Sequence, residues 1–207
     1  MIVRELPYGA TSALFEVDDT TAAIALSRWL TAHRPAGAIE IVPAARTVLV
    51  TCAAASDLAH ARAAVDSFEP LDADDPTTGT VVEVPARYDG EDLAEVAITI
   101  GMSVAELIDL HCRATYSAAF CGFVPGFAYL TGLDPVLHLP RRPTPRARVP
   151  RGSVAIGANF TGVYPTASPG GWHLLGHALV EMFDPRRARP ALIAPGDFVR
   201  FVAVTDA

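Results

Sequence analysis

Residues 121–177 read CGFVPGFAYLTGLDPVLHLPRRPTPRARVPRGSVAIGANFTGVYPTASPGGWHLLGH, and the rest of the chain is interpreted around them. Proline and glycine recur throughout this stretch, and between residues 135 and 180 the chain has five arginines and no Asp or Glu. A long, turn-rich stretch within a compact domain usually carries function, because ordering it costs conformational entropy. We therefore expect a cationic functional segment in a chain whose formal net charge is −7.

Short apolar runs typical of β-strands surround this segment, at residues 80–87, 153–156, 178–183 and 198–204. Two helices are predicted before it, of which the first is capped by Asp89 and ends at Gly101. The second begins with a capping box of Ser103 and Glu106. His111 lies on the apolar face of that helix and is interpreted as a hydrogen-bonded core residue. Short strands with long Gly/Pro-rich loops predict a β-barrel or sandwich that carries a helical pair.

Residues 1–69 alternate strand and helix signals. Helices with one apolar face are predicted after Asp19 and after Ser56 or Asp57, and strand-like runs lie at residues 2–6, 13–17, 39–42 and 47–51. This pattern predicts a small α+β unit in which helices cover one face of an antiparallel sheet. The acidic, proline-bracketed residues 69–79 are predicted to be the domain boundary, with an α+β domain at 1–75 and a mainly β domain at 76–207.

All sixteen basic residues are arginine, so the chain of 207 residues has no lysine. That absence excludes a Schiff-base lysine for pyridoxal phosphate, a biotin-accepting lysine and a Walker A lysine. Three cysteines without a CxxC pair indicate neither a disulfide framework nor a metal site. The apolar runs are shorter than the roughly 20 residues of a membrane helix, and the N-terminus lacks signal-peptide features. We therefore expect a cytoplasmic protein without membrane contact.

The candidate substrate-binding arginines of the cationic segment are Arg141, Arg142, Arg146 and Arg148. Guanidinium groups bind carboxylate or phosphate in a bidentate way, which favours a small anion. Nucleic acid is not an expected partner, because it normally needs an extended basic face. Alternatively, these arginines dock on the acidic surface of a partner protein or of this chain's own N-terminal half. A ligand pocket at such an interface would satisfy both interpretations.

Two further features of the stretch are candidates for chemistry. Gly170 and Gly171 are expected to expose backbone N–H groups that hold a developing oxyanion, or else to form a tight turn against which Trp172 packs. His177 is the candidate catalytic residue, because an imidazole transfers protons near neutral pH. The alternative for His177 is a structural hydrogen bond.

Hydroxyl and thiol groups complete the candidate site. Tyr129, Thr161 and Tyr164 are expected to present hydroxyls to the same substrate, or else to pack the barrel. Cys121 would act as a thiolate nucleophile only in an exposed, electropositive setting. Its apolar neighbours indicate burial, so a nucleophilic role is disfavoured.

Several motifs of this sequence resemble one known family. They are PGFAYLTGLDP at 125–135, PRRPTPRARVPRGSVAIG at 140–157, TGVYPTASPGGWHLLGH at 161–177, FDPRR at 183–187 and PGDFVRF at 195–201. In this order they resemble the family that includes the B subunit of 5-oxoprolinase, allophanate hydrolase subunit 1 and KipI, whose members correspond to subdomains C and D of a carboxyltransferase domain. The resemblance implies an α+β N-terminal unit followed by a mainly β, cyclophilin-like barrel domain.

The resemblance also implies an activity. It is ATP-dependent hydrolysis of 5-oxoproline to glutamate, or of an allophanate-type C–N bond, by a complex of several subunits. The expected partners are a homologous second subunit and a LamB/YcsF-type subunit. ATP is then expected at the level of the complex rather than on this chain alone, and no metal or biotin is expected on this chain. The alternative is a KipI-like inhibitor of a sensor histidine kinase without catalytic activity.

Overall fold

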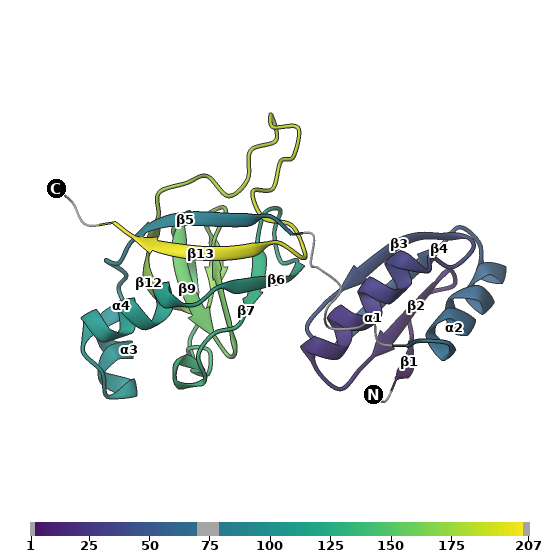
Figure 1. The fold of residues 1–207 in the computed structure, drawn as a ribbon, viewed down its shortest axis with the longest axis horizontal. Coiled ribbons are helices and arrows are strands. Elements are labelled where there is room, and N and C mark those ends of the chain that lie inside the picture. Colours follow the sequence, from purple (N-terminus) through teal and green to yellow (C-terminus); the bar gives the residue numbers. More distant parts are fainter. Residues whose placement is uncertain (1–2, 70–78, 205–207) are drawn as a thin grey trace. The chain divides into compact units, whose positions relative to one another are not determined.

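The structure is a computed structural model of the chain and describes residues 3–69 and 79–204. The chain divides into two compact units, Met1–Pro76 and Thr77–Ala207 (Figure 1). Most of the predicted boundary segment, residues 70–78, lies outside the described residues, so its role as a linker stays a prediction. Each unit has a hydrophobic core of its own.

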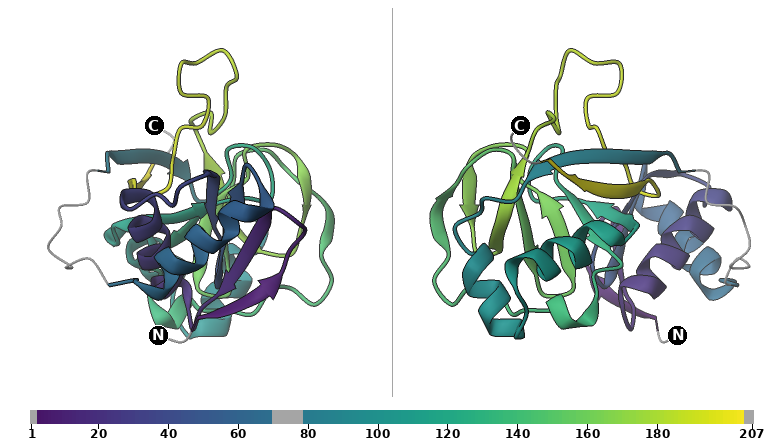
Figure 2. Two further views of the ribbon diagram at one scale, coloured as in Figure 1. Left: turned by 90° about the vertical axis from the view of Figure 1, so that its right-hand side faces the viewer. Right: turned by 60° about the vertical axis from the view of Figure 1, so that its left-hand side comes forward.

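The N-terminal unit is a four-stranded antiparallel sheet with two helices packed on one face (Figure 2). Its elements are β1 (Arg4–Pro7), β2 (Ser12–Glu16), α1 (Thr20–Ala32), β3 (Ala38–Pro43), β4 (Thr47–Cys52), a 3₁₀ turn (Ala55–Asp57) and α2 (Leu58–Asp66). The strand order is β1-β2-β4-β3. The Asp19 side chain accepts a hydrogen bond from the Ala22 amide and caps α1, while Leu26 and Leu30 bury its apolar face. The predicted α+β unit is thereby confirmed.

The C-terminal unit is a closed seven-stranded barrel with the strand order β10-β7-β6-β13-β5-β12-β9. The barrel strands are β5 (Val81–Arg87), β6 (Tyr116–Cys121), β7 (Ala128–Thr131), β9 (Ser153–Gly157), β10 (Phe160–Val163), β12 (His173–Ala178) and β13 (Phe198–Ala203). A two-stranded sheet of β8 (Arg146–Val149) and β11 (Ser168–Gly170) and a 3₁₀ turn (Pro135–Leu137) accompany it. Among the described strand pairs, only β5 and β13 run parallel. The predicted mainly β barrel is confirmed.

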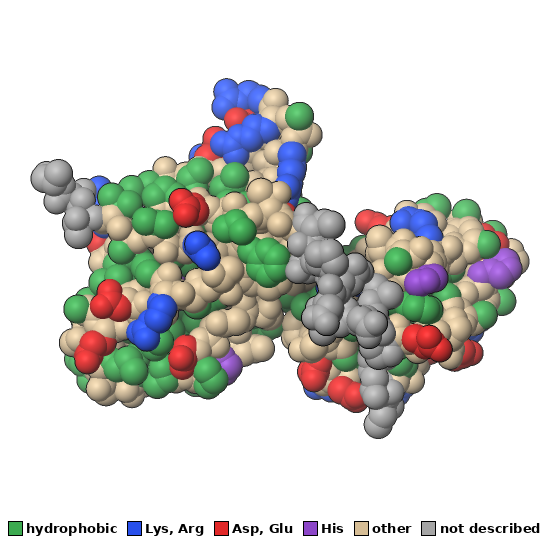
Figure 3. Space-filling model, viewed as in Figure 1, with side chains coloured by type: hydrophobic (Ala, Val, Ile, Leu, Met, Phe, Trp, Pro, Cys, Tyr) green, Lys and Arg blue, Asp and Glu red, His purple; other side chains and the backbone are tan. Residues whose placement is uncertain are grey.

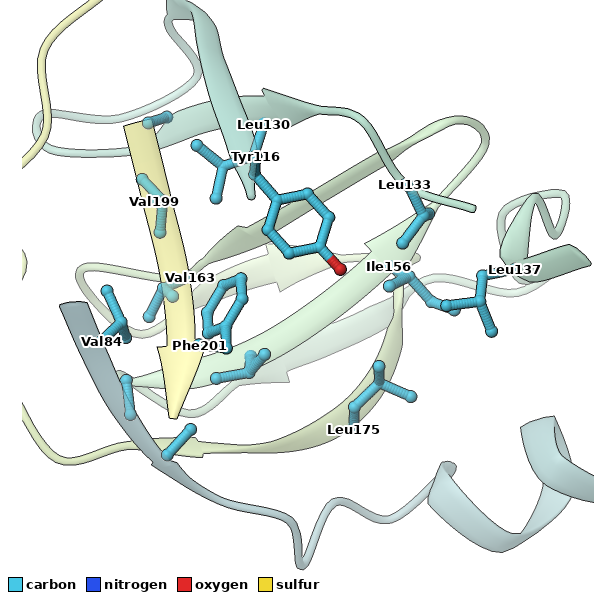
Figure 4. Packing of buried hydrophobic residues seen from close by; sticks show 14 of the residues in the cluster. Val84, Tyr116, Leu130, Leu133, Leu137, Ile156, Val163, Leu175, Val199 and Phe201 are labelled. Atoms are coloured by element: carbon cyan, nitrogen blue, oxygen red, sulfur yellow. The ribbon is translucent and has the colours of Figure 1, made fainter. Parts of the chain in front are cut away.

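Side chains fill the interior of this barrel (Figure 4). Tyr116, Phe201, Leu130 and Ile156 are fully or almost fully buried there. Each such side chain stabilises the fold by about 1.5–3 kcal/mol through removal of apolar surface from water. The barrel interior is therefore a packed core, and candidate ligand sites lie outside it.

The chain leaves the barrel earlier than the sequence predicts. The expected strand at 178–183 is wrong, because β12 spans His173–Ala178 and the chain then turns away. Gly176 lies in this strand although glycine disfavours strands. A Cβ there would lie 2.2 Å from the Arg87 carbonyl oxygen, so only glycine permits β12 to approach β5. This requirement of the packed barrel overrides the local propensity.

The two predicted helices are present as α3 (Leu93–Ile100) and α4 (Val104–Arg113). Gly101 ends α3 in the left-handed conformation with φ 71°, and Ser103 and Glu106 form the predicted capping box. The prediction that Asp89 caps α3 is wrong, because the capping position belongs to Asp92. No helix among residues 3–69 and 79–204 is long and apolar enough to cross a membrane.

The connection between β12 and β13 projects away from the barrel in every view (Figures 1 and 2). Basic side chains gather on it in the space-filling view (Figure 3), and they belong to Arg186, Arg187 and Arg189. All three are paired within the loop or at its base: Arg186 and Arg187 with Asp184, and Arg189 with Asp197. The loop is therefore ordered by its own ion pairs.

Candidate functional site

A second group of aromatic side chains packs apart from the barrel core, on β6, β7, β10 and the segments that follow them. We call it the aromatic cluster, and its members are Phe120, Phe127, Tyr129, Phe160, Tyr164 and Trp172. Phe120 and Tyr129 stack with ring centroids 4.4 Å apart, and Phe127 contacts Trp172 edge-on at 5.4 Å. Rings in such contacts hold one another in place. The cluster is therefore a rigid base for the polar groups beside it.

The Tyr164 hydroxyl lies against the backbone of β11. A Cβ on Gly170 would be 2.3 Å from Tyr164 Oη, so only glycine allows this approach. The Trp172 backbone amide acts on the same hydroxyl and favours its ionised form. Burial raises the pKa of Tyr164 and outweighs the lowering by this amide and by nearby arginine charges. The hydroxyl is therefore protonated at neutral pH and can donate a hydrogen bond.

Arg141 is the exposed cation beside this cluster. Its charge acts on both Tyr129 and Tyr164 and opposes the burial that raises their pKa values. Among the residues described, no carboxylate pairs with Arg141 or with Arg148. The guanidinium of Arg141 is therefore available to bind an anion.

Arg142 and Arg146, in contrast, are held by Asp92. Asp92 Oδ1 accepts hydrogen bonds from Arg142 Nη1 at 2.8 Å and from Arg146 Nη2 at 2.7 Å. Asp92 Oδ2 accepts the Leu174 amide at 2.7 Å, and the residue is 2% exposed. Burial alone would raise the pKa of Asp92, but the hydrogen bonds and the two arginine charges lower it below its usual value. The carboxylate therefore stays ionised inside the protein.

This pairing gives Arg142 and Arg146 acidic partners within the chain, while their part in substrate binding stays a prediction. Further acids at the start of α3 contact the same arginines: Glu91 contacts Arg146 and Glu95 contacts Arg142, both at 3.3 Å. Two of the four candidate arginines are thus held inside the chain. The other two pair with no carboxylate among the described residues.

Three buried polar atoms around β8, β11 and β12 have no hydrogen-bond partner among the described residues. They are Arg146 Nη1, Ser168 Oγ and His173 Nδ1. Buried polar atoms are costly unless a water or a bound polar group meets them. All three atoms lie around the arginine segment, where water or a bound polar group would meet their hydrogen-bonding needs.

The predicted oxyanion turn at Gly170 and Gly171 has a different local structure. Gly170 belongs to β11 and pairs with Arg146 across the two-stranded sheet, and the Gly171 carbonyl accepts the Arg142 amide at 2.7 Å. Trp172 packs over Gly157 rather than over these glycines. The structure thus gives Gly170 a packing role, and oxyanion binding by these residues stays a prediction.

His177 lies on β12 beside the turn at Gly152. It is exposed, opposite Ser153, with its imidazole over Gly152 and no side-chain hydrogen-bond partner among the described residues. The Gly152 amide donates to the Tyr164 carbonyl at 2.7 Å, so His177 and the backbone of Tyr164 both contact Gly152. A catalytic role for His177 stays a prediction.

Thr161 packs inside the barrel. It is fully buried, and its hydroxyl donates to the Ala155 carbonyl and accepts from His111 Nε2 at 2.9 Å. His111 Nδ1 in turn accepts from the Tyr88 hydroxyl at 2.7 Å. The prediction that His111 is a hydrogen-bonded core residue is confirmed, and of the two interpretations of Thr161 the structure shows the second, packing inside the barrel.

Cys121 is half-buried, and its Sγ faces the Ile193 carbonyl at 3.9 Å. Burial and the charge of Asp197 raise the pKa of its thiol. A protonated thiol is a weak nucleophile, which agrees with the disfavoured role. Among residues 3–69 and 79–204, no three His, Cys, Asp or Glu side chains are placed to hold a metal ion.

Two important residues escape sequence reasoning. Asp92 resembles any acid at a helix start, and its arginine partners lie 50 and 54 positions away. Trp172 looks like a residue that packs on a glycine turn, whereas it joins rings from other segments of the barrel. The frequency of aromatic residues between 120 and 129 is a local signal that could have indicated the aromatic cluster.

The curated relatives of this chain all carry one name, the B subunit of 5-oxoprolinase. The protein named as the B subunit of 5-oxoprolinase in Escherichia coli O157:H7 is 51% identical over 124 residues, which are 58% of this chain and 57% of the relative. The protein of the same name from Bacillus subtilis strain 168 is 41% identical over 129 residues, 61% of this chain and 54% of the relative. These matches thus span little more than half the length of the curated relatives.

Solved structures agree with the fold. TTHA0988 matches with a TM-score of 0.78 and 36% identity, covering 95% of this chain and 40% of that one. PH0987 from Pyrococcus horikoshii matches with a TM-score of 0.59 and 29% identity over 97% of both chains. Kluyveromyces lactis urea carboxylase shares the fold alone, with a TM-score of 0.72 and 19% identity over 98% of this chain and 22% of that one.

The family model described as carboxyltransferase domain, subdomain C and D, matches residues 3–193. That range includes the N-terminal sheet, most of the barrel, Asp92, the arginine segment and the aromatic cluster. The resemblance read from the motifs is confirmed, and this chain belongs to the family of carboxyltransferase domains, subdomains C and D.

Proposed function

We propose that this chain is a subunit of a 5-oxoprolinase-type hydrolase that acts together with partner subunits. The observation that carries the proposal is the exposed guanidinium of Arg141, which pairs with no carboxylate among the described residues and whose charge acts on Tyr129 and Tyr164. The names of the curated relatives support it. 5-Oxoproline is a small planar lactam with one carboxylate. A cation for the carboxylate, the partly exposed Tyr129 for the lactam and a rigid aromatic base suit such a molecule.

The chemistry divides between this chain and its partners. In the proposed reaction ATP transfers its γ-phosphoryl group to the lactam carbonyl oxygen and leaves as ADP, water adds to that carbon, and the ring C–N bond and the C–O bond to phosphate break to release glutamate and inorganic phosphate. This chain has no lysine and therefore no Walker A motif. We therefore assign ATP to the complex, and to this chain the binding and orientation of the substrate. The proposed partners are a homologous second subunit and a LamB/YcsF-type subunit.

Reconstitution tests the proposal. The chain is mixed with the second subunit and the LamB/YcsF-type subunit, and glutamate release from 5-oxoproline is followed with ATP. Absence of turnover by the complete complex would show that the proposed function is wrong. A complex that turns over allophanate but not 5-oxoproline would also contradict it.

Substitution of Arg141 tests the site itself. A charge-assisted hydrogen bond to a carboxylate contributes about 1.5–3 kcal/mol, so we expect Arg141→Ala to lower kcat/KM for 5-oxoproline by roughly 10- to 100-fold. Arg200→Ala removes an exposed arginine on β13 and is the matched control. Equal kinetics of the Arg141 and Arg200 variants would place the carboxylate elsewhere.

A further inference from the structure

Phe123 has an unusual backbone conformation in the loop between β6 and β7. Its φ is 69°, in the left-handed region that bulky residues rarely adopt. The Val124 amide donates to the Gly122 carbonyl at 2.9 Å, so Phe123 is the central residue of a three-residue turn. With a positive φ at its centre, this is the rare and strained form of the γ-turn. The loop therefore holds Phe123 in a conformation that costs folding free energy.

The neighbouring hydrogen bonds explain why the strain persists. The Gly122 amide donates to the Phe127 carbonyl at 3.2 Å, and the Phe127 amide donates to the Val124 carbonyl at 3.0 Å. These bonds close the loop and leave position 123 no other backbone conformation. Glycine or asparagine would adopt this conformation at lower cost than phenylalanine.

The Phe123 ring lies at the rim of the aromatic cluster. It contacts Phe127 edge-on at 5.6 Å and Tyr164 edge-on at 6.4 Å between ring centroids. Phe127 and Tyr164 are 2% and 3% exposed, whereas Phe123 is 57% exposed. One side of its ring therefore covers the cluster and the other faces solvent, next to the tyrosine on which Arg141 acts.

We propose that Phe123 is a substrate-contacting residue whose exposed ring packs against the planar ring of a cyclic amide bound by Arg141. Backbone strain and exposure of an aromatic ring both destabilise the free chain, and strain of this kind gathers at ligand-contacting positions. The Phe123 ring contacts Tyr164, and the charge of Arg141 acts on the same tyrosine. This inference rests on the proposed function and names a further residue of the same site.

Two variants in the full chain, assembled with its partner subunits, test the proposal. Phe123→Gly and Phe123→Asn both suit a positive φ and both remove the ring. We expect the KM for 5-oxoproline to rise about 3- to 10-fold, the range of an aromatic contact. We also expect the Tm of the isolated chain to stay equal or rise in both variants, and affinity for the second subunit to stay unchanged.

Two matched controls separate strain from contact. Ala158 is the other non-glycine residue with a positive φ among those described, at 53°. Ala158→Gly should therefore raise the Tm without removing an aromatic ring. Val202, on β13, is an exposed apolar residue of the same barrel, 42% exposed. Val202→Ala should leave the KM for 5-oxoproline at the wild-type value.

Other outcomes overturn the inference in distinct ways. An unchanged KM with weaker binding of the second subunit would make Phe123 an anchor for that subunit. A lower Tm in both Phe123 variants would assign the ring to the fold. If the wild-type complex releases no glutamate, the proposed function fails. Saturation-transfer NMR of 5-oxoproline with the full chain then tests the contact between Phe123 and the cyclic amide by itself. Equal saturation transfer with wild type and Phe123→Gly would overturn the contact.

Discussion

His111 shows how one buried residue can be satisfied without carrying charge. Its imidazole is 0% exposed, and both ring nitrogens are hydrogen-bonded, to Tyr88 and to Thr161. Burial disfavours the imidazolium and lowers the pKa of His111 to about 3. The hydrogen bonds explain why a histidine on an apolar helical face belongs to the core and not to a site.

The depressed pKa of His111 predicts acid sensitivity of the barrel. The unfolded chain binds a proton near pH 6.5 while the folded chain does not until about pH 3, so stability falls as pH falls through this window. We expect a loss of about 2 kcal/mol between pH 7.5 and pH 5, above the range where carboxylates titrate. Urea unfolding followed by Trp172 fluorescence in a Trp29→Phe background measures it.

Variants of single histidines check the assignment of this effect. His111→Gln should remove most of the pH dependence between pH 7.5 and pH 5, because no imidazole is left to gain a proton on unfolding. His60→Gln, at an exposed position of the N-terminal unit, should leave it unchanged. A wild-type barrel equally stable at both pH values would contradict the prediction.

At the scale of elements, α3 acts as a clamp on the arginine segment. Asp92 at its start binds arginines next to and within β8 and an amide of β12, and the Asp92 amide donates to the Leu174 carbonyl at 3.1 Å. Both arginine side chains keep some exposure, 29% for Arg142 and 19% for Arg146. Asp92 thus joins three elements that are distant in the sequence.

Removal of the Asp92 carboxylate should therefore be costly. Removing one partner of a buried ion pair lowers the free energy of unfolding by about 3–5 kcal/mol. Because the two arginines are partly exposed, we expect the loss for Asp92→Ala to lie near the lower end of that range. Urea unfolding of the barrel measures the loss. Glu95→Gln is the matched control, since the side chain of Glu95 is 63% exposed and its contact should contribute under about 1 kcal/mol. Equal stabilities of the two variants would show that Asp92 is not the clamp.

At the scale of the whole molecule, the chain has two separate cores. Leu26 and Val50 belong to the core of the N-terminal unit, and Leu130 and Phe201 to that of the barrel. Each unit also contains one tryptophan, Trp29 in the first unit and Trp172 in the second. The fluorescence of the two indoles can therefore report on the two units separately.

The separate cores predict separate responses to mutation. Leu26→Ala creates a cavity in the N-terminal core, where Leu26 is 0% exposed, and should cost about 2–5 kcal/mol. Unfolding is followed with Trp172→Phe to observe Trp29 and with Trp29→Phe to observe Trp172. We expect the Trp29 transition to shift to lower urea and the Trp172 transition to stay in place. A common shift of both would show that the units unfold as one.

Much of the fold can be predicted from local signals. The cap at Asp19, the capping box of Ser103 and Glu106, and the left-handed Gly101 all depend on residues within four positions of one another. Strands β6, β7, β8, β10, β11 and most of β12 escape prediction, because their pairing is decided by other strands and most of them have only three or four residues, which carry too little periodicity. The candidate site is equally hard to predict from local signals, because its residues come from distant parts of the chain.

The sequence by itself determines the composition of the site: arginine as the only basic residue, a segment without acids, and the motifs of the family. Only the tertiary structure decides which groups are free. It pairs Arg142 and Arg146 with Asp92, buries Thr161 against His111, leaves Arg141 without a carboxylate partner among the described residues, and places the strained Phe123 beside Tyr164. The reason is physical: whether a charge or hydroxyl can meet a ligand depends on its nearest neighbours in space, and these lie tens of residues away along the chain.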